Sequence, residues 1–334
     1  MSEGQTADIA SETGAGPKRH SFWVDVFIRL VKEKPLGTVG LALVAVLFFT
    51  GIFADLHWLS WVGVPVEKAD SWGLAPEGIN DIHLKNRLDA PSAEFPLGND
   101  NLGRCVLSRV IHGARLSMIV GLVGTALHTV ISTAIGMICA FLGGKVDIIV
   151  QRFVDAWMCF PNLVILITLM AIMGPGLIQI LLVLGVSNGI RAARFKRSLV
   201  FGIKENVYVE ASQAIGARTG RILIFHLLPN ILPMIIVLFT ISMGGIILAE
   251  ASLSFLGLGL PPPYPSWGGM VSGAGRVHMV RAPWMMLWPG IALSLAVFGI
   301  NMLGDALRDL LDPRLRGKMG RYGGKASKKV KVRL

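Results

Sequence analysis

The sequence is poor in charged residues and in cysteine. Only 16% of its 334 residues are Asp, Glu, Lys or Arg, whereas 53% are hydrophobic and lie in long runs, a composition typical of membrane proteins. The three cysteines, Cys105, Cys139 and Cys159, have neither C-x-x-C nor C-x-x-H spacing, so we expect no disulfide framework and no metal site. The phosphate-binding motif G-x-x-x-x-G-K-S/T is missing from the sequence. We therefore expect no nucleotide hydrolysis by this chain.

The formal net charge of +11 does not indicate a nucleic-acid-binding protein. The basic residues flank the apolar runs and are not interleaved with aromatic side chains in the way that a base-stacking surface requires. Lys and Arg are enriched beside membrane helices on the cytoplasmic side, which explains their placement better. We expect contact with membrane lipid and none with nucleic acid.

The apolar runs are long enough to cross a membrane. A helix needs roughly 20 apolar residues to span a hydrocarbon core of about 30 Å, because its backbone polar groups must be satisfied within the segment. The fourth run is the weakest, since only the 15 residues from Gly176 to Ile190 are apolar, and hydropathy alone also allows five spans. We expect an all-α polytopic membrane protein with six spans, at residues 36–56, 116–142, 150–173, 176–193, 231–255 and 287–307.

The composition also divides the chain into segments. Apolar residues recur every three or four positions from Phe22 to Val31, which predicts an amphipathic helix on the membrane surface that ends at Pro35. The small, polar residues that precede it predict disorder. The predicted segments are a disordered cytoplasmic N-terminus at 1–20, the amphipathic helix and first span at 21–56, an external loop at 57–115, a core domain with five spans at 116–310, and a basic cytoplasmic tail at 311–334.

The charges of the loops predict the orientation. Residues 191–221 carry seven Lys or Arg against two Glu, so this stretch is expected in the cytoplasm. Residues 57–115 carry six basic and seven acidic residues, which places them outside. With six spans, both termini are cytoplasmic.

The stretch YVEASQAIGARTGRILIFHLLPN, from Tyr208 to Asn230, predicts a helical hairpin. Glu210 and Ala211 favour a short helix, and Gly216 can adopt positive φ at its end. A second helix begins at Ile222, and Pro229 is expected to terminate or kink it. From charge alone, an ordinary loop between two spans explains the segment equally well.

Glu-Ala-Ser, the Gly six residues after the Glu, and His-Leu-Leu-Pro-Asn resemble the EAA loop of permease subunits of binding-protein-dependent ABC importers. Ser212 stands where that family usually has a second Ala. The resemblance implies that the loop at residues 194–230 couples the permease to an ATPase subunit. The residues that it implicates are Glu210, Ala211, Ser212, Gly216, Ala217, Arg218 and Pro229.

The stretch FPLGNDNLGRCVLSRVIHGARLS, from Phe95 to Ser117, resembles the signature of the oligopeptide, dipeptide and nickel branch of these importers. It departs from that pattern at Phe95, Asn99 and Cys105, and the change at Cys105 removes a carboxylate that could pair locally. The matching residues include Gly98, Asp100, Gly103, Arg104, Ser108, Arg109 and Arg115.

These resemblances, which run from about residue 22 to 317, are closest to the second permease of a peptide importer. They imply the type I ABC importer permease fold in a bacterial or archaeal inner membrane, and a non-catalytic subunit that forms half of a peptide pathway. The implied partners are a homologous permease, two ATPase subunits that bind ATP and Mg, and an extracytoplasmic solute-binding protein. This chain itself is expected to bind no cofactor. Relatives carry dipeptides, oligopeptides, nickel complexes or oligosaccharides, so the solute stays open.

Ionisable residues near the spans are candidates for the pathway or an interface. Glu250 and Asp305 would serve an alternative, a secondary transporter driven by an ion gradient, although both can equally cap helix ends or pair at a subunit interface. Asp155 shares a polar face with Asp147, and could either line the pathway or pair with Arg152. A membrane scaffold without transport activity is a third possibility that composition leaves open.

Overall fold

A computed structural model describes residues 22–55 and 73–311, which are mostly helical, with an isolated bridge between Asn99 and Cys105 as the one β feature of these ranges. The predicted N-terminal tail, residues 56–72 and the tail from 312 lie outside the described residues. The helices are α1 (Phe22–Glu33), α2 (Pro35–Ile52), η2 (Leu84–Asn86), α4 (Val106–Ile119), η3 (Val120–Gly124), α5 (Thr125–Leu142), α6 (Gly144–Cys159), α7 (Asn162–Met173), α8 (Leu177–Lys204), α9 (Val207–Ala214), α10 (Thr219–Arg221), η4 (Ile222–Leu227), α11 (Leu228–Phe255), α12 (Trp267–Val277) and α13 (Trp284–Leu311).

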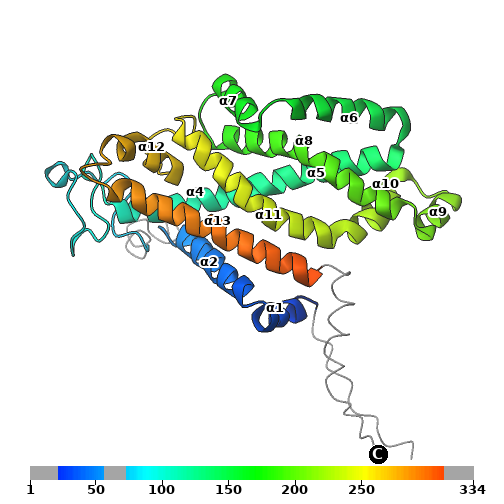
Figure 1. The fold of residues 1–334 in the computed structure, drawn as a ribbon, viewed down its shortest axis with the longest axis horizontal. Helices are drawn as coiled ribbons and strands as arrows, with labels where there is room; N and C mark the ends of the chain where they lie inside the picture. The colour runs from blue at the N-terminus through cyan, green and yellow to red at the C-terminus, as the bar shows by residue number, and fades with distance from the viewer. Residues whose placement is uncertain (1–21, 56–72, 312–334) are drawn as a thin grey trace, which may run out of the picture.

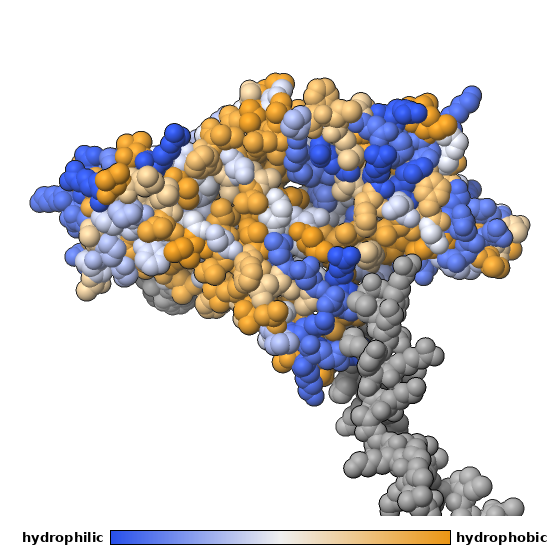
Figure 2. Space-filling model, in the orientation of Figure 1, coloured by the Kyte–Doolittle hydropathy of each residue, from blue (hydrophilic) through white to orange (hydrophobic). Residues whose placement is uncertain are grey.

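The long helices form an elongated bundle (Figure 1). Helix α5 packs along α8, α13 lies between α2 and α11, and α6 and α7 cover α8. Residues 73–105 and α12 lie at one end of the bundle, here called the signature end, and α9 lies at the opposite end, here called the α9 end. On the face shown in Figure 2, apolar residues predominate in the middle, and polar residues gather at both ends of the bundle and around α1. This distribution is expected for a protein whose long axis crosses a membrane.

Five helical segments are long and apolar enough to cross a membrane, and a bent pair of helices provides a sixth. The pair is α6 and α7, which meet at 92°, so the straight span predicted at 150–173 is wrong. Pro161 follows Phe160, whose backbone is extended at φ −85° and ψ 141°. A proline disfavours helical geometry in the residue before it and cannot donate a backbone hydrogen bond, which breaks the helix there.

Two helices extend beyond their predicted ends, because hydropathy detects only the apolar part of a helix. The second span begins at Val106 rather than at 116, in a polar turn that includes buried Ser108 and Arg109. Helix α8 continues past 193 to Lys204, whose Nζ donates to the carbonyl oxygens of Ala140 and Phe141 at the end of α5. The region predicted as a loop at 194–230 therefore begins and ends within helices.

Pro229 does not terminate the helix that begins before it, which corrects that part of the expectation. The π-helical turn η4 leads directly into α11, where Pro229 lies in the first turn and Pro233 follows. The π-helical turn before Pro229 displaces the regular pairing of backbone N–H and carbonyl groups, so the N–H that this proline lacks costs little there. One helical stretch therefore runs from Thr219 to Phe255.

The two ends of the described chain lie close together. Helix α1 packs its Leu30 against Leu310 and Leu311 of α13 and Val237 of α11. The Nζ of Lys34, between α1 and α2, lies 2.6 Å from a carboxylate oxygen of Asp309. The chain thus enters and leaves the bundle on one side.

Small residues allow α5 and α8 to approach closely. A Cβ atom added at Gly136 of α5 would lie 2.7 Å from the backbone nitrogen of Arg197 and 2.8 Å from the Cβ of Lys196. These distances are too short for any side chain, so the backbones themselves are in contact, as at many helix pairs in membranes.

We expect Gly136→Ala to destabilise the protein by about 1–3 kcal/mol, because the added methyl group must push α8 away from α5. The matched control is Gly245→Ala on α11, where an added Cβ meets nothing within 4 Å. Thermal unfolding of the purified protein in detergent measures the stability of each variant against that of the unchanged protein. Equal melting temperatures for the two variants would contradict this account of the packing.

Candidate functional site

Helix α9 is a short helix at its end of the bundle, with a regular C-terminal cap. It ends in a Schellman motif, in which the N–H of Ala217 donates to the carbonyl oxygen of Ser212 at 3.1 Å and that of Gly216 to Gln213 at 2.9 Å. Gly216 has φ 81°, a conformation that glycine adopts without strain. The predicted short helix and its glycine cap are both present.

The two faces of α9 differ in burial. Val209 is fully buried and packs in a cluster with Ile222, Leu227 and Ile231, which also contains residues from the ends of α5 and α8. Ser212 is buried on the same face and its hydroxyl donates to the carbonyl oxygen of Tyr208 at 2.7 Å. The substitution of Ser for the Ala of the resembling motif therefore leaves no buried hydroxyl without a partner.

The outer face of α9 combines apolar and charged side chains. Val207 is 80% exposed and Ile215 is 84% exposed. Of the predicted coupling residues, Ser212 is buried and Ala217 is half-buried, and the exposed ones are Glu210, Ala211, Gly216, Arg218 and Pro229. An exposed apolar pair on a rigidly anchored helix has the character of a protein contact site.

At the signature end, Asp100 organises a tight turn before α4. Its Oδ1 accepts from the backbone N–H groups of Leu102 at 2.8 Å and Arg104 at 3.0 Å. Its Oδ2 lies 2.7 Å from Nε of Arg104 and 3.7 Å from Nε of Arg109. Gly98 and Gly103 flank this turn with φ 75° and 79°. Several residues of the predicted signature thus meet at one carboxylate.

The remaining signature residues tie α4 to its surroundings. The guanidinium of Arg115 donates to a carboxylate oxygen of Asp55, just beyond α2, at 2.9 Å, and to the carbonyl oxygen of Gly51 at 3.0 Å. The hydrogen bond from His112, together with Arg115, holds the pKa of Asp55 below its usual range although burial opposes this. Ser108 accepts from the backbone N–H of Glu77 at 3.0 Å. Asp55 could not be recognised as part of this cluster from the sequence, because its partners His112 and Arg115 lie far along the chain.

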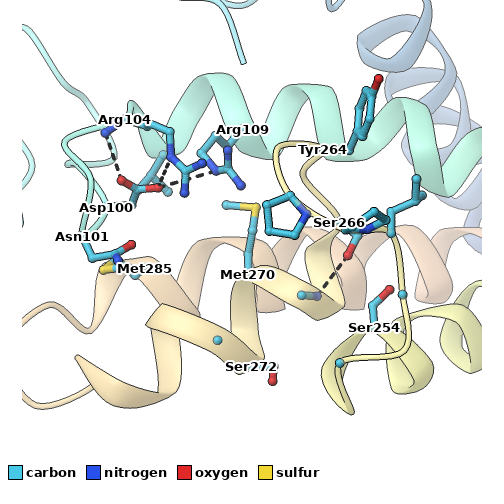
Figure 3. A pocket seen from close by; sticks show the side chains of 18 of the residues that line it. Asp100, Asn101, Arg104, Arg109, Ser254, Tyr264, Ser266, Met270, Ser272 and Met285 are labelled. Carbon is cyan, nitrogen blue, oxygen red and sulfur yellow. Dashed lines mark hydrogen bonds and ion pairs between the residues drawn. The ribbon is translucent and has the colours of Figure 1, made fainter. Parts of the chain in front are cut away.

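A cavity of about 410 Å³ opens beside the Asp100 turn (Figure 3). Arg104 and Arg109 lie on one side of it, Ser254 and Ser266 lie on the other, and Met270 rises from α12 between them. Neither the helix α12 nor the cavity was predicted from the sequence. The local sequence, with three prolines at 261–263 and glycines at 268 and 269, favours an irregular segment instead.

The predicted pathway residues do not form one site. Glu250 is fully buried in α11 and accepts a hydrogen bond from Ser254 at 2.5 Å. Asp155 pairs with Arg194 of α8 at 3.1 Å rather than with Arg152, and Asp147 pairs with Arg197, because α6 lies against α8. Asp305 is exposed in α13. Among the described residues, no group of three His, Cys, Asp or Glu could hold a metal ion.

Comparison with known proteins places this architecture in a family. Residues 132–317 match the family described as binding-protein-dependent transport system inner membrane component. The dipeptide transport system permease protein DppC of Alkalihalophilus pseudofirmus is 36% identical over 88% of this chain and 90% of its own length. The oligopeptide transport system permease protein OppC of Bacillus subtilis is 34% identical over 95% of this chain and 97% of its own length. The di/tripeptide transport system permease protein DppC of Pseudomonas aeruginosa is 35% identical over 83% of this chain and 88% of its own length. The chain therefore belongs to the inner membrane components of binding-protein-dependent transport systems.

Proposed function

We propose that this chain forms half of the membrane pathway of an ATP-driven peptide importer, in which α9 receives the mechanical work of an ATPase subunit. The observation that carries the proposal is the structure of α9, whose inner face is packed on α5, α8 and α11 while its outer face presents Val207 and Ile215. The relatives described above are named as peptide permeases, which supports a peptide as the solute.

The partner subunits bind ATP together with Mg and hydrolyse the ATP, and this chain contributes contact rather than chemistry. The apolar tip at Ile215 inserts into a groove of the ATPase subunit, and Glu210 and Arg218 beside it offer charged contacts. Because Val209 is packed among the ends of three long helices, movement of α9 is transmitted to the bundle and not absorbed by a loop.

The orientation follows from this assignment. The α9 end lies in the cytoplasm with both termini, and the signature end faces the extracytoplasmic binding protein. Helices α6 and α7 expose apolar side chains, including Ile149, Phe153 and Ile172, to lipid and to the homologous second permease. The protein is thus a multi-pass component of the inner membrane.

The family assignment does not support the alternative of a secondary transporter. Glu250 and Asp305 lie toward opposite ends of the bundle, on α11 and α13 (Figure 1), and one of them is buried while the other is exposed. Secondary transporters place their coupling groups together near the membrane midplane.

We expect Ile215→Asp to release the ATPase subunits from the complex. A charge at the centre of an apolar contact weakens the binding free energy between permease and ATPase by at least about 2 kcal/mol, or roughly thirtyfold in affinity. Retention of ATPase subunits on the purified, tagged permease measures this. Leu84→Asp provides the control, since it makes the same change at a residue 64% exposed at the signature end. Equal retention in both variants would remove α9 from the interface.

We also expect the complex of this chain, the second permease, two ATPases and the binding protein to accumulate radiolabelled dialanine in proteoliposomes only when ATP is supplied. Collapse of the proton and sodium gradients by ionophores should leave the rate unchanged, because nucleotide binding supplies the work. A nickel complex and an oligosaccharide serve as competing solutes. Uptake that needs an ion gradient instead of ATP would disprove the proposal.

A further inference from the structure

The cavity at the signature end has an uneven balance of charge. Arg104 and Arg109 both approach Asp100, and in the described ranges no other acidic side chain forms an ion pair with either arginine. Asp100 is also occupied by two backbone N–H groups, of Leu102 and Arg104. Two guanidinium groups therefore share one carboxylate, which leaves one positive charge uncompensated.

This charge is held away from water. The side chains of Arg104, Arg109 and Asp100 are 14%, 10% and 8% exposed. Nη1 of Arg109 has long contacts, at 3.4 Å and 3.5 Å, with the carbonyl oxygens of Ile79 and Pro263. The terminal nitrogens of Arg104 form no hydrogen bond within the described part of the chain. Donors of a guanidinium that are poorly satisfied in a shielded place favour a planar anion.

The rest of the cavity suits a small organic solute. Met270, Met285 and Pro261 contribute apolar surface, and Ser254 and Ser266 contribute hydroxyl groups opposite the arginines. Its volume of about 410 Å³ lies in the range of about 300–1,000 Å³ that is typical of ligand pockets. An inorganic anion would leave most of this space and its apolar wall unused.

We propose that Arg104 and Arg109 form a binding site for the terminal carboxylate of a peptide as it enters the membrane pathway. This inference rests on the proposed peptide solute. Every linear peptide carries this carboxylate whatever its side chains are, so an importer that accepts many sequences can hold its solutes by that group. The guanidinium groups bind the carboxylate, and the apolar wall at Met270 accommodates the neighbouring side chain without specific contacts.

The test uses the complete transporter in lipid nanodiscs without the binding protein, with trialanine and trialanine amide as probes in calorimetric titrations. We expect trialanine to bind at least about tenfold more tightly than its amide, since the amide lacks the charge that the arginines pair with. Arg109→Gln should abolish this preference. Arg87→Gln should retain it, because Arg87 is exposed and outside the cavity, with its Nε bonded to the carbonyl oxygen of Asn101 at 2.7 Å.

A second pair of variants covers the case in which Arg109→Gln does not assemble. Met270→Glu places a carboxylate in the cavity and should remove the preference for trialanine, whereas the neutral Met270→Gln should keep at least part of it. Equal binding of acid and amide, or equal behaviour of the two Met270 variants, would overturn the inference.

The same variants distinguish other outcomes. If no trialanine binds, and Arg109→Gln instead weakens docking of the binding protein, then the arginines receive an acidic side chain of that protein and the inference is wrong. In either case, ATP-driven uptake of dialanine by the complete transporter is measured separately. Uptake without the acid preference leaves the proposed function standing and rejects only the carboxylate site.

Discussion

Within a bilayer every backbone N–H and C=O group must find its partner inside the protein, and this requirement determines where the functional parts of the chain lie. The described spans satisfy it as helices, and most of the irregular backbone gathers at the two ends of the bundle (Figure 1). The Asp100 turn and the cap of α9 belong to these irregular stretches. Polar side chains and unpaired backbone groups can meet water or a partner there, whereas the surface of the middle of the bundle is mostly apolar.

The two prolines that interrupt apolar segments show how local context decides the outcome. At Pro161 the preceding residue is extended, and the chain turns through 92° between α6 and α7. At Pro229 a π-helical turn precedes the proline and the helix continues to Phe255. A π turn displaces the regular pairing of carbonyl and N–H groups, so a missing donor just after it costs little. The residue is the same in both cases, and only the turn before it differs.

This contrast also marks what could be predicted from the sequence. The spans and α1 follow from local apolar patterns, and the family follows from contiguous motifs around Glu210 and Asp100, so these predictions needed no long-range contacts. The sequence left Asp155 open between the pathway and an ion pair with Arg152, and it gave no sign of Arg194, which the packing of α6 on α8 brings to Asp155.

The cavity could not be predicted for the same reason. Its walls combine Arg109 of α4 with Pro261 and Met270, which only the folded chain brings together. Helix α12 was missed because four of its first seven residues are glycine or serine, a composition that favours a loop. The roles of the coupling residues remain predictions, since they concern contacts with other subunits.

The two candidate sites share one structural element. The helical stretch from Thr219 to Phe255 contains 37 residues and spans about 55 Å at 1.5 Å per residue. Ser254, near one end, lines the cavity, and Ile222 and Ile231, near the other, pack with Val209 of α9. The π turn η4 lies between α10 and α11, where a change in helix geometry is easiest to absorb.

A packed cluster resists gradual deformation, so a displacement of α9 must either move α11 or break the contacts of Val209. In the proposed importer, a peptide that binds the cavity more tightly in one arrangement of α11 favours that arrangement and the position of α9 that goes with it. If an ATPase subunit binds α9 in the other position, the peptide weakens the affinity for the ATPase subunit by some factor. The ATPase subunit must then weaken the affinity for the peptide by the same factor, because the coupling free energy between two sites is reciprocal. Release of the solute then needs no chemistry in this chain, only a partner with different affinities for two positions of α9.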